Sequence, residues 1–152
     1  MDVFTYLKAL FSALLSIAVL VAVSWRAVSA PGDIGHAKVI VNKVFGKTLS
    51  RSIRQGDPVY QNQRIRTGRD SGTDIRFLDK SQLIIGELSD VRLNRMIYDP
   101  DKSKVTGSLT MVKGVLRFAS TRSVRMDLKV NTPHALLGIR GTIFDVFTST
   151  GD

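Results

Sequence analysis

The sequence predicts an all-β domain of short strands that follows an N-terminal signal helix. After residue 30, apolar and polar residues alternate with period two, as they do in strands buried on one face. No stretch of this region keeps the i, i+3, i+4, i+7 spacing of an amphipathic helix. Turn-forming residues recur at intervals of roughly 8–12 positions, which fits a sandwich, a small barrel or a solenoid-like stack. The pattern favours a solenoid-like or sandwich-like domain and does not choose between them.

The first 30 residues predict an export signal. Between Lys8 and Arg26 lie 17 uncharged positions, fewer than the roughly 20 apolar residues of a membrane-spanning helix. Small residues follow at 27–30, as at a signal-peptidase site, and a cut after Ser29 keeps Pro31 away from the cleaved bond. We therefore expect residues 1–30 to be a cleaved signal peptide and residues 31–152 to be a periplasmic or secreted domain. An uncleaved anchor in the inner membrane is the alternative.

Five strands are expected in the first half of the domain, and each ends at residues that supply a positive or a fixed φ. The strands are residues 37–44, 58–66, 73–77, 82–85 and 90–96. The turns fall at Gly46, residues 56–58, 68–72 and 79–81, and Gly86. Between the first two strands, residues 47–55 are polar and basic apart from two apolar positions. This composition predicts a loop or a weak edge strand.

Four more strands are expected in the second half. They are residues 108–112, 115–119, 124–130 and 142–147, with turns at residues 99–101, Gly107, Gly114, residues 132–133 and Gly138. Every second residue along the strands is apolar and would face inward. The expected core consists of Val39, Val41, Ile75, Phe77, Leu83, Ile85, Val91, Leu93, Leu109, Met111, Leu116, Phe118, Val124, Met126, Leu128, Val130, Phe144 and Val146.

The composition argues against an enzyme. The chain has no cysteine, which removes disulfides, zinc-thiolate sites, iron–sulfur ligation and thiol nucleophiles. Its two histidines, His36 and His134, lie nearly a hundred positions apart. The sequence contains no G-x-S-x-G elbow, no phosphate-binding glycine loop and no D-x-[DN]-x-[DN]-G calcium loop. We expect no catalytic residue, no cofactor and no metal site.

The charge of the domain is strongly positive. The whole chain carries +9, and loss of residues 1–30 removes two of 22 basic and one of 13 acidic residues, which leaves 20 and 12 and a net charge of +8. An exported domain meets lipid headgroups, lipopolysaccharide, cell-wall polymers and acidic proteins rather than nucleic acid. Basic residues that alternate with apolar ones, as in residues 124–130, are also typical of the solvated face of a strand. The distribution of the charge distinguishes a binding surface from a solvated face. An even spread argues against polymer binding, and a basic face favours it.

Several short motifs follow one another in a fixed order. They are Gly56-Asp57, residues 66–71 with Thr67-Gly68 and Ser71, Phe77-Leu78-Asp79-Lys80-Ser81, Leu88-Ser89, residues 113–118 with Gly114, Thr132-Pro133-His134-Ala135, and residues 140–146 with Arg140-Gly141-Thr142. In this order they resemble the FecR-like domain family, over residues 35–147. The resemblance implies an extracytoplasmic, β-rich, solenoid-like domain of bacterial signalling. In the best-known members this domain relays the occupancy of an outer-membrane siderophore transporter to a sigma factor.

The resemblance does not carry that full role. Such regulators place an anti-sigma helix bundle before their membrane span and a transporter-docking module after the FecR region, and the sequence suggests neither. The expectation is therefore a stand-alone, exported interaction domain. Its partner would be an unidentified envelope protein, with an anionic envelope polymer or lipid as the alternative, and no nucleic acid.

Two positions depart from the family pattern. Lys80 stands where the family usually has glycine, so the turn must avoid a positive φ or tolerate its cost. Family members usually continue into a further strand after residue 147. We therefore expect an edge without a partner strand, as in a C-terminally truncated domain.

The last motifs supply the candidate structural or recognition residues, which are Thr132, Pro133, Gly138, Arg140, Gly141 and Thr142. Thr132-Pro133 predicts an extended or turn geometry, and the two glycines permit tight bends or a close strand approach. Gly141 is expected at a positive φ or where a side chain is excluded. Arg140 is expected to pair with Asp145 or Asp127, and an exposed contact to an anion is the alternative.

Overall fold

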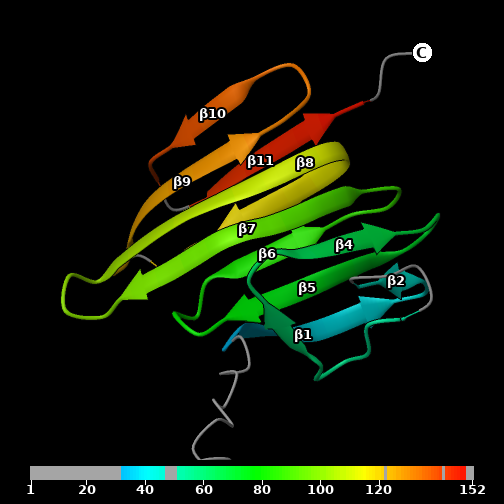
Figure 1. Cartoon of the computed structure of the whole chain (residues 1–152), viewed down its shortest axis with the longest axis horizontal. Coiled ribbons are helices and arrows are strands. Elements are labelled where there is room, and N and C mark those ends of the chain that lie inside the picture. The colour runs from blue at the N-terminus through cyan, green and yellow to red at the C-terminus, as the bar shows by residue number, and fades with distance from the viewer. Residues whose placement is uncertain (1–31, 47–50, 122, 142, 150–152) are drawn as a thin grey trace, which may run out of the picture. The chain divides into compact units, whose positions relative to one another are not determined.

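The computed structural model describes residues 32–46, 51–121, 123–141 and 143–149 as a single sheet of eleven strands (Figure 1). The described part contains no helix, and therefore none that could cross a membrane. The all-β prediction is confirmed. The expected signal peptide, residues 1–30, and residues 47–50 of the expected loop lie outside the described residues.

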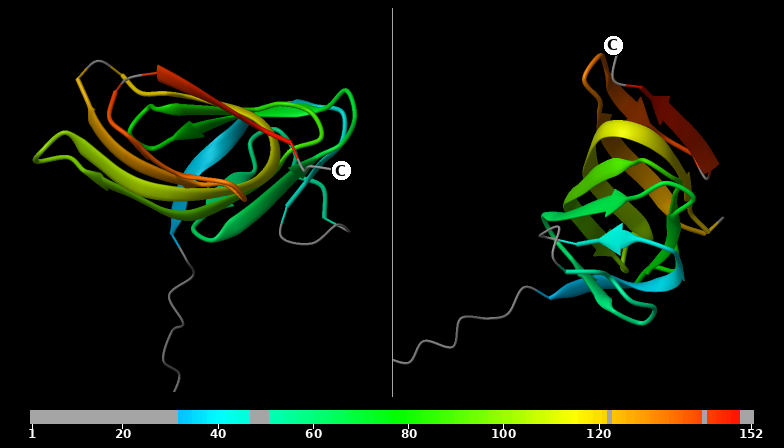
Figure 2. Two further views of the ribbon diagram at one scale, coloured as in Figure 1. Left: turned by 90° about the horizontal axis from the view of Figure 1, so that it is seen from above. Right: turned by 90° about the vertical axis from the view of Figure 1, so that its right-hand side faces the viewer.

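The strands run in order as β1 (Asp33–Val41), β2 (Val44–Phe45), β3 (Pro58–Tyr60), β4 (Gln63–Thr67), β5 (Gly72–Phe77), β6 (Gln82–Ile85), β7 (Asp90–Asp99), β8 (Lys104–Ala119), β9 (Arg125–Asn131), β10 (Leu136–Ile139) and β11 (Ile143–Thr148). The β7 half of the sheet has the order β2-β4-β7-β8-β9-β10. The β6 half has the order β3-β1-β5-β6-β8-β11. All neighbours are antiparallel except β8 and β9, which are parallel. The two halves share β8, through which the sheet curls (Figure 2).

Strand β8 must bend, because a short link connects its end to a residue that pairs with its beginning. A straight strand of 16 residues spans about 50 Å. Its last residue, Ala119, is joined by six peptide links to Arg125, which pairs with Lys104 at the other end of β8. That link reaches at most about 21 Å. Gly114 has a φ of +107°, a conformation that glycine adopts at little cost, and the neighbours of β8 change there from β7 and β9 to β6 and β11.

The sequence prediction of two strands with a turn at Gly114 is therefore wrong. Backbone pairing continues on both sides of this residue, so the glycine bends a continuous strand. A second boundary also differs from the prediction, because residues 58–66 form two strands. Asn62 takes a φ of +59° between β3 and β4. Residues 136–139, for which no strand was expected, form β10 against β9.

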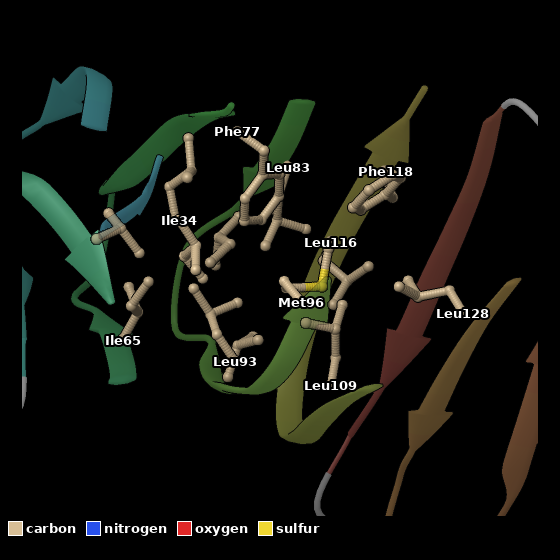
Figure 3. Packing of buried hydrophobic residues seen from close by; sticks show 14 of the residues in the cluster. Ile34, Ile65, Phe77, Leu83, Leu93, Met96, Leu109, Leu116, Phe118 and Leu128 are labelled. Atoms are coloured by element: carbon tan, nitrogen blue, oxygen red, sulfur yellow. The ribbon is translucent and has the colours of Figure 1, made fainter. Parts of the chain in front are cut away.

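The core lies between the two halves of the curled sheet, in a sandwich-like arrangement (Figure 3). Phe118 on β8 is fully buried and stacks with Phe77 at 5.9 Å and with Phe144 at 5.6 Å between ring centroids. Of the expected core, Phe144 is partly buried, and Val39 and Val41 are exposed at 43% and 48%. A bulge between Ala37 and Val39 in β1 explains the two valines, since one extra residue moves the following side chains to the other face.

Candidate functional site

Most of the sequence motifs form turns rather than a site. Thr67 Oγ1 accepts a hydrogen bond from Ser89 N at 2.9 Å, and Ser89 Oγ accepts one from Val115 N at 3.0 Å. Asp79 accepts bonds from both the amide and the hydroxyl of Ser81. These side chains are buried, apart from partly buried Val115, and satisfy backbone groups where strands end. Their role in the described chain is therefore structural.

Lys80 shows how the departure from the family pattern is accommodated. Its φ is +68°, so the turn keeps the positive φ that glycine would adopt without cost. The Lys80 amide donates to Phe77 O at 3.0 Å, and its carbonyl accepts from Arg76 Nη1 at 3.0 Å. These hydrogen bonds hold the turn in place. The conformational cost of a non-glycine residue is tolerated here.

The candidate recognition residues lie at the β9–β10 hairpin and directly after it. Thr132 N and Oγ1 both bond to Ala135 O, at 2.8 and 3.1 Å, and close the turn that contains exposed Pro133. Gly138 on β10 stands opposite Lys129 on β9, and a Cβ on it would meet nothing within 4 Å. The hairpin is thus a local structural unit. Thr142 lies outside the described residues.

Arg140 and Gly141 are both exposed. The expected pairing of Arg140 is wrong, because both carboxylates have other partners. Asp145 on β11 stands opposite Arg117 on β8 and accepts two bonds from it, at 2.6 and 2.7 Å. Asp127 contacts Lys104 at 3.4 Å. Gly141 has the expected positive φ, +157°, yet a Cβ there would meet no atom within 4 Å.

Arg140 and Gly141 line part of a groove of about 500 Å³. Three basic side chains line it, from Lys104 on β8, Arg125 on β9 and Arg140 after β10. Val124, Met126, Asp127 and Gly141 complete the lining. The strands bring Lys104 and Arg125 together because β8 and β9 run in parallel with these two residues in register. The groove therefore combines positions that lie far apart in the sequence.

The groove continues into a basic surface on the outside of the β7 half. Buried Val105, Leu109 and Met111 of β8 alternate with hydroxyl residues that face outward. Arg95 on β7, Ser108 on β8 and Lys129 on β9 share one register row across the sheet. We call this surface the cationic face, and it consists of Arg92, Arg95, Ile97, Asp99, Lys104, Thr106, Ser108, Thr110, Arg125, Asp127, Lys129, Asn131 and Arg140.

Carboxylates near the cationic face are already engaged. Asp90 accepts two hydrogen bonds from Arg64, at 2.6 and 2.5 Å, and these bonds and the carboxylate charge raise the pKa of Arg64. Asp99 accepts from Lys102 at 3.0 Å, which lowers the pKa of Asp99. In contrast, Arg92, Arg95, Arg125, Lys129 and Arg140 form no ion pair with any carboxylate of the described chain. Five exposed cations therefore remain available to an external anion.

The outer face of the β6 half has a different character. It exposes large apolar side chains, including Ile143 at 66% and Phe147 at 75% on β11. The paired Arg117 and Asp145 lie between β8 and β11 there. The two outer faces therefore differ in degree. The β7 half also exposes Ile97 and Leu136, and the β6 half also carries Lys38 and Lys80, which form no ion pair within the described residues. Unpaired positive charge gathers on the β7 half.

The described residues offer no constellation for catalysis that sequence reasoning missed. Within ranges 32–46, 51–121, 123–141 and 143–149, no group of three His, Asp or Glu residues could hold a metal ion. A second groove, of about 330 Å³, has mixed polarity, with Arg51, Asp57 and Tyr60 among its lining residues. Asp57 there accepts from Arg54 N at 2.9 Å, which is a turn contact. Sequence reasoning did miss the clustering of cations on β7, β8 and β9, because strand register creates it.

Comparisons with known proteins bear on the family and not on the site. The sequence matches the family described as FecR protein over residues 63–152, more than half of the chain. No curated protein matches it. A solved structure described as "Cell surface anchoring domain" matches with 25% identity and a TM-score of 0.38, over 40% of this chain and 84% of that one. A TM-score this low supports no argument about fold or function. The family match confirms the resemblance seen in the motifs.

Proposed function

Because the chain belongs to the FecR protein family, we propose that it is a non-enzymatic interaction domain that acts in signalling in the periplasm. Residues 1–30 would export it, and residues 31–152 would bind a protein of the bacterial envelope. Signals from the envelope or from iron uptake are the inputs that family membership suggests. The all-β fold supports this function, since a rigid sheet presents side chains in fixed rows.

One observation carries the proposal, namely the cationic face. Its five exposed cations have no carboxylate partner among the described residues, although most nearby carboxylates are paired. Charges that are held in rows on a sheet and not neutralised within the chain attract an oppositely charged partner over a distance of about a Debye length. The face therefore supports an interaction with an acidic partner.

The test is a crosslinking pull-down of the tagged protein from its own envelope, with cell fractionation beside it. We expect a cleaved protein in the periplasmic fraction that starts at Ala30 or Pro31 and is crosslinked to an envelope protein. An uncleaved, cytoplasmic product would contradict the proposal. If crosslinking is unchanged in the double variant Arg95→Gln with Lys129→Gln, the cationic face is not the surface that binds the partner.

A second candidate is a basic module that binds an anionic polymer or lipid of the envelope. The gathering of unpaired cations on the β7 half is the observation that favours it, because evenly spread charge would give a polymer no path to follow. The two candidates differ in the captured molecule. Protease treatment of the pulled-down material destroys the partner in the first case and leaves it intact in the second.

A further inference from the structure

We propose that the cationic face binds a linear polymer of repeating phosphate groups, laid along β8 and ending in the groove between Lys104, Arg125 and Arg140. This inference rests on the second candidate function and names its ligand class and its site.

The face has the form of a trough. Its floor is the column of short hydroxyl side chains on β8, Thr106, Ser108 and Thr110. Basic side chains stand on both sides at Ser108, which lies between Arg95 and Lys129. Arg92 and Asn131 flank Thr110, and Ile97 and Asp127 flank Thr106. Adjacent strands are about 4.8 Å apart, so the flanking Cα atoms stand roughly 10 Å from each other across β8. A linear chain fits between such walls. Hydroxyl groups can donate to phosphate oxygens from below while guanidinium groups approach from the sides.

The length of the trough calls for a polymer. From Thr110 to Lys104 the floor spans about 20 Å, which is longer than a single phosphate. Each exposed ion contact is weak because water and salt screen it. A polymer that engages several such contacts gains from their high effective concentration, and a free phosphate does not. The predominance of arginine on the face favours phosphate, since the guanidinium fork bonds it in a bidentate manner.

Two carboxylates lie on this face. Asp99 stands in register with Lys104 and is paired with Lys102, whereas the second, Asp127, makes the arrangement testable. Asp127 on β9 stands in register with Thr106 and contacts Lys104 at 3.4 Å, at the point where the trough meets the groove. A phosphate group there would be repelled by Asp127 and would compete with it for Lys104. Removal of this charge should therefore strengthen binding. A merely solvated basic surface would show no such dependence on one central residue.

A lipid surface fits the trough less well. Membrane-bound faces combine basic residues with apolar side chains that enter the headgroup region. Among the exposed large apolar residues of the described chain, Ile97, at 41%, flanks the trough at Thr106, and Leu136, at 66%, lies beyond it on β10. Ile143 and Phe147 lie on the β6 half. The residues of the cationic face include no aromatic side chain on which the bases of single-stranded nucleic acid would stack. The chemistry of the face thus favours a non-nucleotide polymer over a bilayer.

The test measures binding of the purified protein to sodium polyphosphate by titration calorimetry at several salt concentrations. We expect binding to the polymer, no saturable binding to orthophosphate at equal phosphate concentration, and weaker binding to polygalacturonate and to phosphatidylglycerol vesicles. Arg95→Gln combined with Lys129→Gln should lower the affinity by about 10-fold or more. The slope of the logarithm of the binding constant against the logarithm of the salt concentration should become shallower by about one for each lost contact. Asp127→Asn should raise the affinity several-fold.

The matched control is Lys38→Gln combined with Lys80→Gln, which removes the same charge from exposed positions of the β6 half. It should change the affinity less than 2-fold, and circular dichroism verifies that all variants are folded. Equal effects of the two double variants, or no polyphosphate binding, would overturn the inference. Equal or stronger binding to polygalacturonate or to vesicles would mean that the ligand is a carboxylate polymer or a lipid surface rather than a phosphate polymer. If polyphosphate fails to bind while an envelope protein is still crosslinked, the interaction domain stands and only this inference falls.

Discussion

Gly114 is the residue on which the curl of the sheet depends most directly. A Cβ at this position would collide with the side chain and the Cα of Ser89, and its φ of +107° is unfavourable for any other residue. Gly114→Ala should therefore lower the free energy of unfolding by roughly 2–4 kcal/mol. Urea denaturation measures this loss.

Gly138→Ala is the matched control, because a Cβ there meets no atom within 4 Å. Its effect should stay within about 0.5 kcal/mol. Equal destabilisation by the two substitutions would show that glycine matters for strands in general and not for the bend. Gly141→Val is expected to be destabilising because of the positive φ at this position, but to cost less than Gly114→Ala, since a Cβ at Gly141 meets no atom within 4 Å.

Arg140 separates folding from recognition. Its side chain is exposed and forms no ion pair within the described residues, so Arg140→Lys should leave the melting temperature unchanged within about 1 °C. Binding of an anionic partner should weaken, since lysine lacks the planar fork of the guanidinium. A lowered melting temperature with unchanged binding would restore the structural role that the sequence suggested.

The pairing of β8 with β11 depends in part on the ion pair between Arg117 and Asp145. The hydrogen bonds from Arg117 hold the pKa of Asp145 below its usual range. Desolvation opposes this effect, and the charge of Arg117 adds to it. A carboxyl group with a lowered pKa binds fewer protons in the folded than in the unfolded chain. Its stabilising effect is therefore present above the ordinary pKa of about 4 and is lost as the pH falls through the folded value.

The corresponding experiment compares the protein with Asp145→Asn in urea between pH 7 and pH 2. The variant should be less stable at pH 7, and the difference should shrink as the pH falls below about 4. The effect is small because the pair is largely exposed. A stability difference that stays constant down to pH 2 would mean that the ion pair does not contribute.

At the scale of single strands, the sequence predicts those features that depend on the local pattern of residues. Alternation located β5 and β6 within a residue of their observed ends, because turn residues bound them on both sides. It misplaced Val39 and Val41, since the bulge in β1 arises from pairing with β5. It also divided β8 at Gly114, because a glycine that ends a strand and a glycine that bends one look alike in a sequence.

At the scale of the whole molecule, the fold class was predictable and the candidate site was not. The parallel pairing of β8 with β9 joins residues about 20 positions apart, and it places Lys104 beside Arg125. No local pattern specifies such a pairing, since it results from the curl of the entire sheet. The motif around Arg140 was recognisable from its sequence, but its neighbours on β8 and β9 were not.

The central claim is that the molecule meets its partner through the cationic face of the β7 half. Photocrosslinking in the living cell tests it most directly, with a photoreactive amino acid placed singly at Arg92 or Lys129, or at Lys38 or Lys80 of the β6 half. All four positions are exposed, so the substitutions should not disturb the fold. The account predicts a higher-mass adduct from Arg92 and Lys129 and none from Lys38 and Lys80. Adducts from the second pair alone, or from none of the four, would contradict it.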